Sequence, residues 1–165
     1  MGLKPWQQIV IDEIESYEDF VNAESIQSIS DFEINRLALI QISLRKGEGH
    51  TFMTAYLAKK YAATVIYYNI DHYKDMEIVG EIGRHGSGEA FHPSSEFVSV
   101  FEMRHDILLS TKNEWIAGKL NALKSKFSNK RLVVIDRGVS VTQQCPEIID
   151  FICQTTQATP IVLLG

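Results

Sequence analysis

Short apolar runs alternate along the chain with longer stretches in which apolar residues recur at helical spacing. The apolar runs are typical of strands and predict them over residues 37–44, 64–70, 97–103, 132–135 and 160–164. Helices are predicted over residues 5–21, 52–62, 110–127 and 145–157, with a weaker candidate at 71–80 and a long glycine-rich loop at 83–95. Strands that alternate with helices are joined by βαβ crossovers. The sequence therefore predicts an α/β fold with a mainly parallel sheet flanked by helices.

The first predicted helix and the first predicted strand precede the most informative region of the chain. In the helix predicted over residues 5–21, Trp6, Val10 and Ile14 fall on one face, and Pro5 suits a first helical turn. The run at residues 37–44 is almost entirely apolar, which is typical of a strand buried on both faces in a parallel sheet. We expect this strand to lead directly into a glycine-containing turn and a helix.

The length of the chain limits the number of domains it can form. A chain of 165 residues fits one domain, so residues 1–165 are expected to form a single unit. The sequence ends directly after the strand predicted at residues 160–164, whereas the ends of domains usually fray into polar residues. We therefore expect the chain to be the N-terminal fragment of a longer protein.

Composition and charge narrow the functional classes. The net charge of −5 argues against autonomous, tight nucleic-acid binding. It is still compatible with a motor domain that contacts nucleic acid through another part of the protein. The two cysteines have no cluster of metal ligands around them and are expected to be free thiols in a reducing compartment. No apolar run approaches the roughly 20 residues that span a membrane, and the N-terminus lacks a signal peptide. We expect a cytoplasmic protein, in the host cell if it is viral, with no membrane partner.

The segment between the first predicted strand and the second helix has the features of a phosphate-binding loop. Such a loop needs glycines that let backbone N–H groups wrap an anion, a helix N-terminus facing it, and a hydroxyl for Mg²⁺. Gly47 and Gly49 supply the first feature, and Thr51 stands where the Mg²⁺ hydroxyl belongs. Arg45 and Lys46 lie beside the loop and could supply positive charge. These residues predict a nucleotide-binding site.

The loop departs from the usual pattern at two positions. Leu44 replaces the first glycine, and His50 replaces the lysine that contacts the β- and γ-phosphates. A neutral imidazole lacks the permanent charge of lysine, although it can donate one hydrogen bond or carry charge when protonated. An ordinary glycine turn between a strand and a helix is the alternative interpretation.

An acidic residue at the end of a later strand completes the candidate site. Asp136 follows the apolar run at residues 132–135, the position from which a carboxylate holds Mg²⁺ or a bound water in phosphoryl-transfer enzymes. Arg137 follows it, where many such enzymes place a glutamate, so the catalytic base stays open among Glu48, Asp71 and Glu147. We assign Asp136 and Glu48 as catalytic candidates and Thr51 and Asp136 as metal ligands. The alternative role for Asp136 is that of a cap after a core strand.

The order of four segments resembles a known family. The segments PWQQ, RKGEGHT, VVIDRG and TPIVLLG are similar to those of the ATPase domain of viral DNA-packaging terminase large subunits and related helicase-like P-loop NTPases. The resemblance implies a RecA-like, three-layer fold, and it spans nearly the whole chain. It also implies that Pro5, Trp6 and Gln7 reach the adenine, that the Walker A element covers residues 45–51, and that Walker B covers residues 132–136.

The function expected from these residues is an ATP-binding, Mg²⁺-dependent ATPase domain of a nucleic-acid motor. ATP is the expected ligand, and DNA would be contacted through other domains or subunits. A homo-oligomer is expected because a neighbour's arginine, from Arg84, Arg104 or Arg137, could complete the site. The main alternative is a nucleotide-binding or scaffold protein that has lost hydrolysis, which His50 and Arg137 favour. A nucleotide or sulfate-group transferase on the same loop is a third possibility.

Overall fold

The structure is a computed structural model, and it describes residues 3–21, 39–42, 49–68, 74, 96–109, 121–127, 132–155 and 159–165. Within these ranges, five strands form one sheet in which every pair of neighbours is parallel, in the order β1-β5-β4-β2-β3. The strands are β1 (Leu39–Ile42), β2 (Thr64–Tyr67), β3 (Glu96–Ser99), β4 (Val133–Asp136) and β5 (Ile161–Leu164). The predicted α/β fold with a mainly parallel sheet is confirmed.

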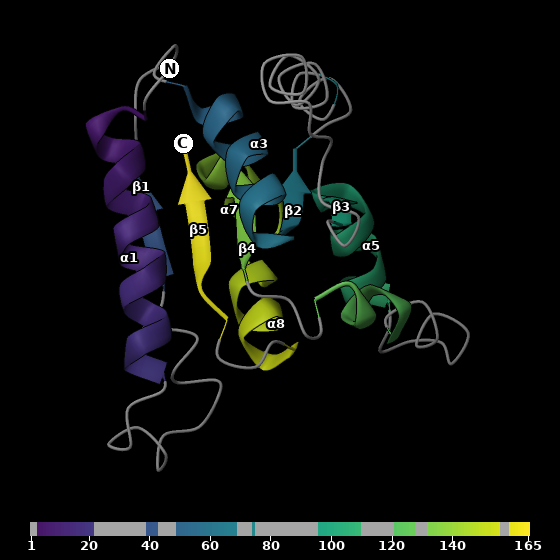
Figure 1. Cartoon of the computed structure of the whole chain (residues 1–165). Helices are drawn as coiled ribbons and strands as arrows, with labels where there is room; N and C mark the ends of the chain where they lie inside the picture. Colours follow the sequence, from purple (N-terminus) through teal and green to yellow (C-terminus); the bar gives the residue numbers. More distant parts are fainter. Residues whose placement is uncertain are drawn as a thin grey trace.

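Helices cover both faces of this sheet (Figure 1). They are α1 (Pro5–Val21), α3 (His50–Tyr61), α5 (Val100–Leu109), α7 (Gly138–Gln144) and α8 (Ile148–Thr155). Two separate clusters of buried side chains fill the spaces between the layers. One cluster joins α1 and α3 to the sheet, and the other joins α5, α7, α8 and residues 121–127 to the opposite face. The result is a coarse three-layer α/β arrangement.

The central strands β4 and β5 are buried along their whole length, as their apolar sequences require. Side chains alternate between the two faces of a strand. Val134 and Val162 therefore pack toward α1 and α3, whereas Val133 and Ile161 pack toward the other cluster. Because helices cover both faces of a parallel sheet, neither face of these strands meets solvent, and polar residues do not alternate with apolar ones along them.

The strand β1 corrects one expectation. It lies at an edge of the sheet and pairs only with β5 among the described strands, and its side chains alternate between exposed and half-buried. Leu39 remains 39% exposed. The prediction of a strand buried on both faces was therefore wrong for β1, because an apolar run predicts a strand without fixing its place in the sheet. The remainder of the run predicted over residues 37–44 lies outside the described residues.

The third predicted strand is shorter than expected. The alternation over residues 97–103 predicted one strand, but β3 ends at Ser99 and α5 begins at Val100. The Ser99 hydroxyl accepts a hydrogen bond from the backbone N–H of Phe101, 3.3 Å away, which is the contact of a helix N-cap. Glu102 stands in the first turn of the helix. Residues 100–103 therefore belong to a helix that this cap starts.

The other predicted elements agree with the structure where it describes them. The helix predicted at residues 5–21 is confirmed in full. The helix predicted at residues 145–157 appears as α8, preceded by the unpredicted helix α7. The loop predicted at residues 83–95 and almost all of the helix candidate at 71–80 lie outside the described residues. In the described part of the chain, no helix has both the length and the apolar content needed to cross a membrane.

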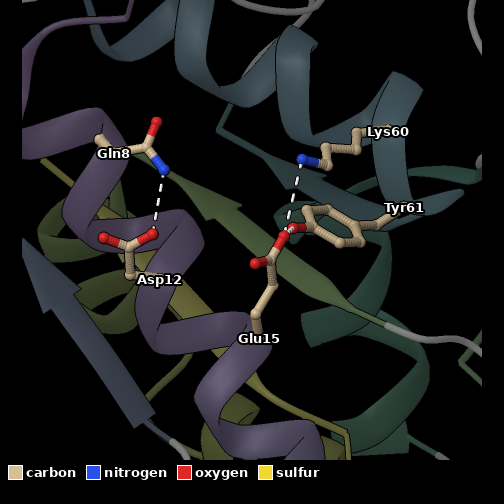
Figure 2. Close-up of polar contacts among 5 residues, drawn as sticks. All are labelled: Gln8, Asp12, Glu15, Lys60 and Tyr61. Atoms are coloured by element: carbon tan, nitrogen blue, oxygen red, sulfur yellow. Dashed lines mark hydrogen bonds and ion pairs between the residues drawn. The ribbon is translucent and has the colours of Figure 1, made fainter.

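The helices α1 and α3 run side by side, and polar contacts join them near the C-terminal end of α3 (Figure 2). The Glu15 carboxylate of α1 lies 3.7 Å from the Lys60 ammonium and accepts a hydrogen bond from the Tyr61 hydroxyl at 3.5 Å. Beneath these contacts, Ile14 and Leu57 are fully buried in the shared core. This packing fixes α1 along α3, and both helices begin at the same end of the molecule (Figure 1).

Candidate functional site

The carboxyl ends of the parallel strands form one edge of the sheet, and α3 begins at this edge. Its first residue, His50, follows Gly49, whose φ of 96° lies in the left-handed region that favours glycine. The Gly49 carbonyl accepts the first helical hydrogen bond, from the N–H of Met53. The positive end of the α3 dipole therefore faces the edge where the strands end. In open α/β sheets this edge is where ligands bind.

Gln7, at the start of α1, lies against Gly49, at the start of α3. Gln7 is only 3% exposed, and its Oε1 accepts a hydrogen bond from the backbone N–H of Lys4 at 2.9 Å. This contact is one half of a capping box, in which the third helical residue reaches back to the cap. The amide nitrogen then faces Gly49, and a Cβ added there would lie 3.2 Å from it. The sequence alone did not reveal the capping role.

Trp6 and His50 also meet where α1 and α3 begin. Their ring centroids are 6.0 Å apart and the rings are tilted by 57°. The Trp6 indole Nε1 is buried and makes no hydrogen bond within the described residues. His50 is half-buried, and the Trp6 ring lies on one side of it. The sequence predicted His50 at the position where a phosphate loop usually carries lysine. The structure thus brings Trp6, Gln7, Gly49 and His50 together from segments far apart in the sequence.

Asp136 ends β4 at the same edge and is 3% exposed. The hydroxyl of Thr54, a fully buried residue one turn into α3, donates a hydrogen bond to Asp136 Oδ1 across 3.4 Å. This contact ties the helix that follows the glycine loop to the end of the acidic strand, 82 residues apart in sequence. Thr54 was missed by sequence reasoning. The available signal was its spacing of three residues from Thr51, which places both on one side of the helix.

The backbone around Asp136 is held by neighbouring segments. Arg137 is exposed and adopts a φ of 52°, in the left-handed region, as the chain turns from β4 into α7. The Val139 N–H donates to the Gly165 carbonyl at 3.2 Å, and the Gly165 N–H donates to the Ile42 carbonyl at 2.9 Å. These bonds join the start of α7 to the residue that follows β5, and join that residue to the end of β1. They hold the backbone that follows Asp136 against the ends of β5 and β1.

The predicted site is only partly described. Arg45, Lys46, Gly47 and Glu48 lie outside the described residues, as does Asp71. Glu147 follows the C-terminal end of α7 and accepts a hydrogen bond from the Cys145 thiol, with 3.8 Å between sulfur and oxygen.

Thr51 and Asp136 could supply two oxygen ligands to a metal ion. Within the described residues, no group of three or more His, Cys, Asp or Glu side chains gathers as a metal site. Mg²⁺ commonly takes one or two protein oxygens together with waters and substrate phosphates. The Thr51 hydroxyl, on a half-buried residue in the first turn of α3, and the Asp136 carboxylate fit this pattern.

The pKa values of Tyr67 and Cys145 are both raised. Burial raises the pKa of Tyr67, at the carboxyl end of β2, and the negative charge of Glu102 adds to the rise. Burial also raises the pKa of Cys145 to about 11, with the charge of Glu147 as the next cause. Both groups therefore stay neutral at pH 7. Cys145 and Cys153 are thiols outside any disulfide, and both are buried.

No protein-family model matches the chain, and a search of curated proteins finds no match to it.

Proposed function

We propose that the chain is an ATP-binding, Mg²⁺-dependent ATPase domain of a nucleic-acid motor, with a RecA-like P-loop fold. The observation that carries the proposal is the contact between Thr54 and Asp136 at the carboxyl edge of the sheet. It brings the helix after the glycine loop to the acidic strand end, which is where a phosphate loop and a Mg²⁺-binding carboxylate must meet.

The start of α3 and its neighbours support the same function. Phosphates would lie at the N-terminus of α3, where Gly49 allows close backbone approach. The Thr51 hydroxyl and the Asp136 carboxylate would hold Mg²⁺, which bridges the phosphate oxygens and neutralises their charge. Gln7 and Trp6 lie beside Gly49 and His50 at the start of α3, and in this proposal they would contact the base of a bound nucleotide.

A second candidate is a protein that binds nucleotide without hydrolysing it, or that serves as a scaffold. His50 favours this candidate because its ring packs near Trp6 and replaces a permanently charged lysine. Arg137 favours it as well, since it stands where a second carboxylate would orient the attacking water. Phosphate release distinguishes the candidates. An enzyme that uses His50 loses turnover in His50→Ala, whereas a scaffold shows no turnover to lose.

Calorimetric titration with ATP and with a slowly hydrolysed analogue, each with and without Mg²⁺, tests the proposal directly. We expect saturable binding that Mg²⁺ tightens, and we expect Thr51→Ala to weaken binding with Mg²⁺ at least tenfold, a change of about 1.4 kcal/mol. Thr155→Ala is the matched control, because the Thr155 hydroxyl bonds only to the Phe151 carbonyl in the described structure, at the far end of α8. Absence of binding at millimolar nucleotide would refute the proposal for this chain.

The proposed partners need separate measurements. DNA contact would come from other domains or subunits, because the chain carries a net charge of −5. A homo-oligomer would let a neighbour's arginine complete the site. Light scattering with and without Mg²⁺ and ATP analogue tests the oligomer, and a change in mass on adding nucleotide is the expected result.

A further inference from the structure

The two halves of the Gln7 side-chain amide face different parts of the molecule. Its Oε1 accepts the hydrogen bond from the Lys4 backbone N–H at 2.9 Å. Because a backbone N–H can only donate, the amide atom that faces it must be the oxygen. The capping bond at the start of α1 therefore fixes which way the amide is turned.

The other half of this amide, the Nε2 group, is directed at the start of α3. A Cβ added to Gly49 would lie 3.2 Å from it. Gln7 is 3% exposed, and within the described residues its side chain makes no hydrogen bond besides the one to Lys4. An amide nitrogen carries two N–H donors and no acceptor. The Nε2 group therefore offers donors to whatever binds at the start of α3.

Trp6, the preceding residue, adds a second donor of the same kind. Its indole Nε1 is buried and has no hydrogen-bond partner within the described residues, and its ring lies beside that of His50. An indole N–H donates and never accepts. Buried polar groups are normally hydrogen-bonded, so two such donors where α1 and α3 begin point to a ligand that carries acceptors.

The purine bases differ in what they present to donors. Guanine presents two adjacent acceptors, N7 and O6, whereas adenine presents the N7 acceptor beside the N6 amino donor. A glutamine pairs with adenine through both halves of its amide, the oxygen accepting from N6 and the nitrogen donating to N7. In Gln7 the oxygen is turned back to Lys4, so the donor half faces the start of α3.

We propose that Gln7 determines base selectivity, and that the nucleotide site prefers guanine, or another base with an acceptor at position 6, to adenine. This inference rests on the proposed function, because it requires the base of a bound nucleotide to lie beside Gln7. It changes which purine is bound best and leaves the roles of Gly49, Thr51 and Asp136 as they are. A donor that meets O6 gains a hydrogen bond, whereas a donor that meets the N6 amino group is left without an acceptor.

Calorimetric titration with slowly hydrolysed triphosphate analogues of adenosine, guanosine and inosine, all with Mg²⁺, tests the selectivity. The ligands share their sugar and phosphates, so differences in Kd report the base. We expect the guanosine Kd to be about three- to tenfold lower than the adenosine Kd, the effect of one hydrogen bond. Inosine has the O6 and N7 acceptors of guanine without its 2-amino group, so its Kd should match the guanosine Kd within about twofold.

Gln7→Glu tests the residue itself, since glutamate keeps an oxygen for the Lys4 N–H and replaces Nε2 by a second oxygen. The ratio of the adenosine Kd to the guanosine Kd should fall to about one or below, because the group that faces the base now accepts. Gln7→Met removes both halves of the amide and should also bring the ratio to about one. The unfolding midpoint of each variant reports the capping bond separately.

Gln8→Glu is the matched control. Gln8 is the next residue of α1 and makes the same change of charge possible, but it is exposed, and its Nε2 donates to Asp12 Oδ1 at 2.9 Å (Figure 2). This variant should leave the ratio of the two Kd values unchanged, because its side chain is held by Asp12.

The outcomes separate this inference from the proposed function. If the wild-type chain binds the adenosine analogue as tightly as the guanosine analogue, or more tightly, the selectivity is refuted and the proposed function stands. A guanosine preference that survives in either Gln7 variant, or that inosine does not share, also refutes the role of Gln7. If none of the three analogues binds at millimolar concentration, both proposals are refuted together.

Discussion

Gly49→Ala is the substitution whose cost can be worked out most fully from the structure. Gly49 has a φ of 96° and precedes α3 directly. A residue with a Cβ pays about 1–2 kcal/mol in the left-handed region. The new Cβ would also lie 3.2 Å from the Gln7 amide nitrogen, so the amide must move by a few tenths of an ångström.

The Gln7 amide has little freedom to move. Its Oε1 accepts the hydrogen bond from Lys4 N at 2.9 Å, and weakening that bond costs up to about 1 kcal/mol. Against these terms, replacing glycine by alanine restricts the unfolded chain and stabilises the fold by about 0.4–1 kcal/mol. The sum is a net loss of about 1–2 kcal/mol in the free energy of unfolding.

Urea denaturation followed by circular dichroism measures this loss. Gln7→Ala removes the side chain that the new Cβ would meet, so Gly49→Ala should cost less in that background, by up to about 1 kcal/mol. The backbone term should remain in both backgrounds. Gly49→Ala with wild-type stability, or equal costs in both backgrounds, would contradict the reasoning about φ or about the Gln7 contact respectively.

Two further predictions concern the core. The pKa of Cys145 is raised from 9.0 to about 11, so its contribution to stability is complete below pH 9 and is lost as the pH rises toward 11. Denaturation midpoints measured across this pH range should therefore fall. Glu147→Gln should make that fall smaller, because the Glu147 charge contributes to the raised pKa. Ile14→Ala should cost about 2–5 kcal/mol because Ile14 is fully buried between α1 and the sheet. Ile9→Ala, on the same helix but 57% exposed, should cost much less, and equal losses would refute the packing of α1.

Periodicity in the sequence was enough to predict most of the fold. The helix at residues 5–21 and the strands ending at Asp136 and Leu164 were found from spacing and apolar content. These signals are strong because burial imposes them: a central parallel strand must be apolar on both faces. The order of strands in the sheet could not be predicted, since the same apolar run suits the edge strand β1 as well as a central one.

Local signals that compete with periodicity account for the misses. Residues 99–102 read Ser-Val-Phe-Glu, which is the sequence of a capping box, yet the alternation around them predicted a continuing strand. The helix α7 is short and follows a residue with a left-handed φ, Arg137, which sequence patterns do not anticipate for arginine. In both places the backbone changes direction at a single residue, where a pattern read over a window of positions gives the wrong boundary.

The sequence names the candidate residues of the site, but it does not give the contacts between them. Gln7, Gly49 and Asp136 were chosen from motifs, and the structure brings Gln7 to Gly49. Thr54 was not chosen, because its hydrogen bond to Asp136 depends on how α3 packs over the end of β4, and only the tertiary structure shows this packing. Sequence spacing within one element predicts neighbours on that element, and contacts between residues 82 positions apart need the fold.

Under the proposed function, His50 stands where a phosphate loop carries lysine, and this affects how nucleotide would bind. ATP carries several negative charges, and the carboxylate of Asp136 would stand at the same edge. The α3 dipole offers about half a positive charge, less than a lysine side chain supplies. Without a second cation, the acid and the phosphates would repel each other in a partly buried setting, where charges are poorly screened. Nucleotide affinity in this chain should therefore depend on Mg²⁺ more strongly than in a loop that keeps its lysine. His50→Lys should accordingly tighten binding most in the absence of Mg²⁺ and narrow the difference between the two conditions. If His50→Lys instead tightens binding equally with and without Mg²⁺, the phosphates do not lie near Asp136, and the pairing of loop and acid proposed above is wrong.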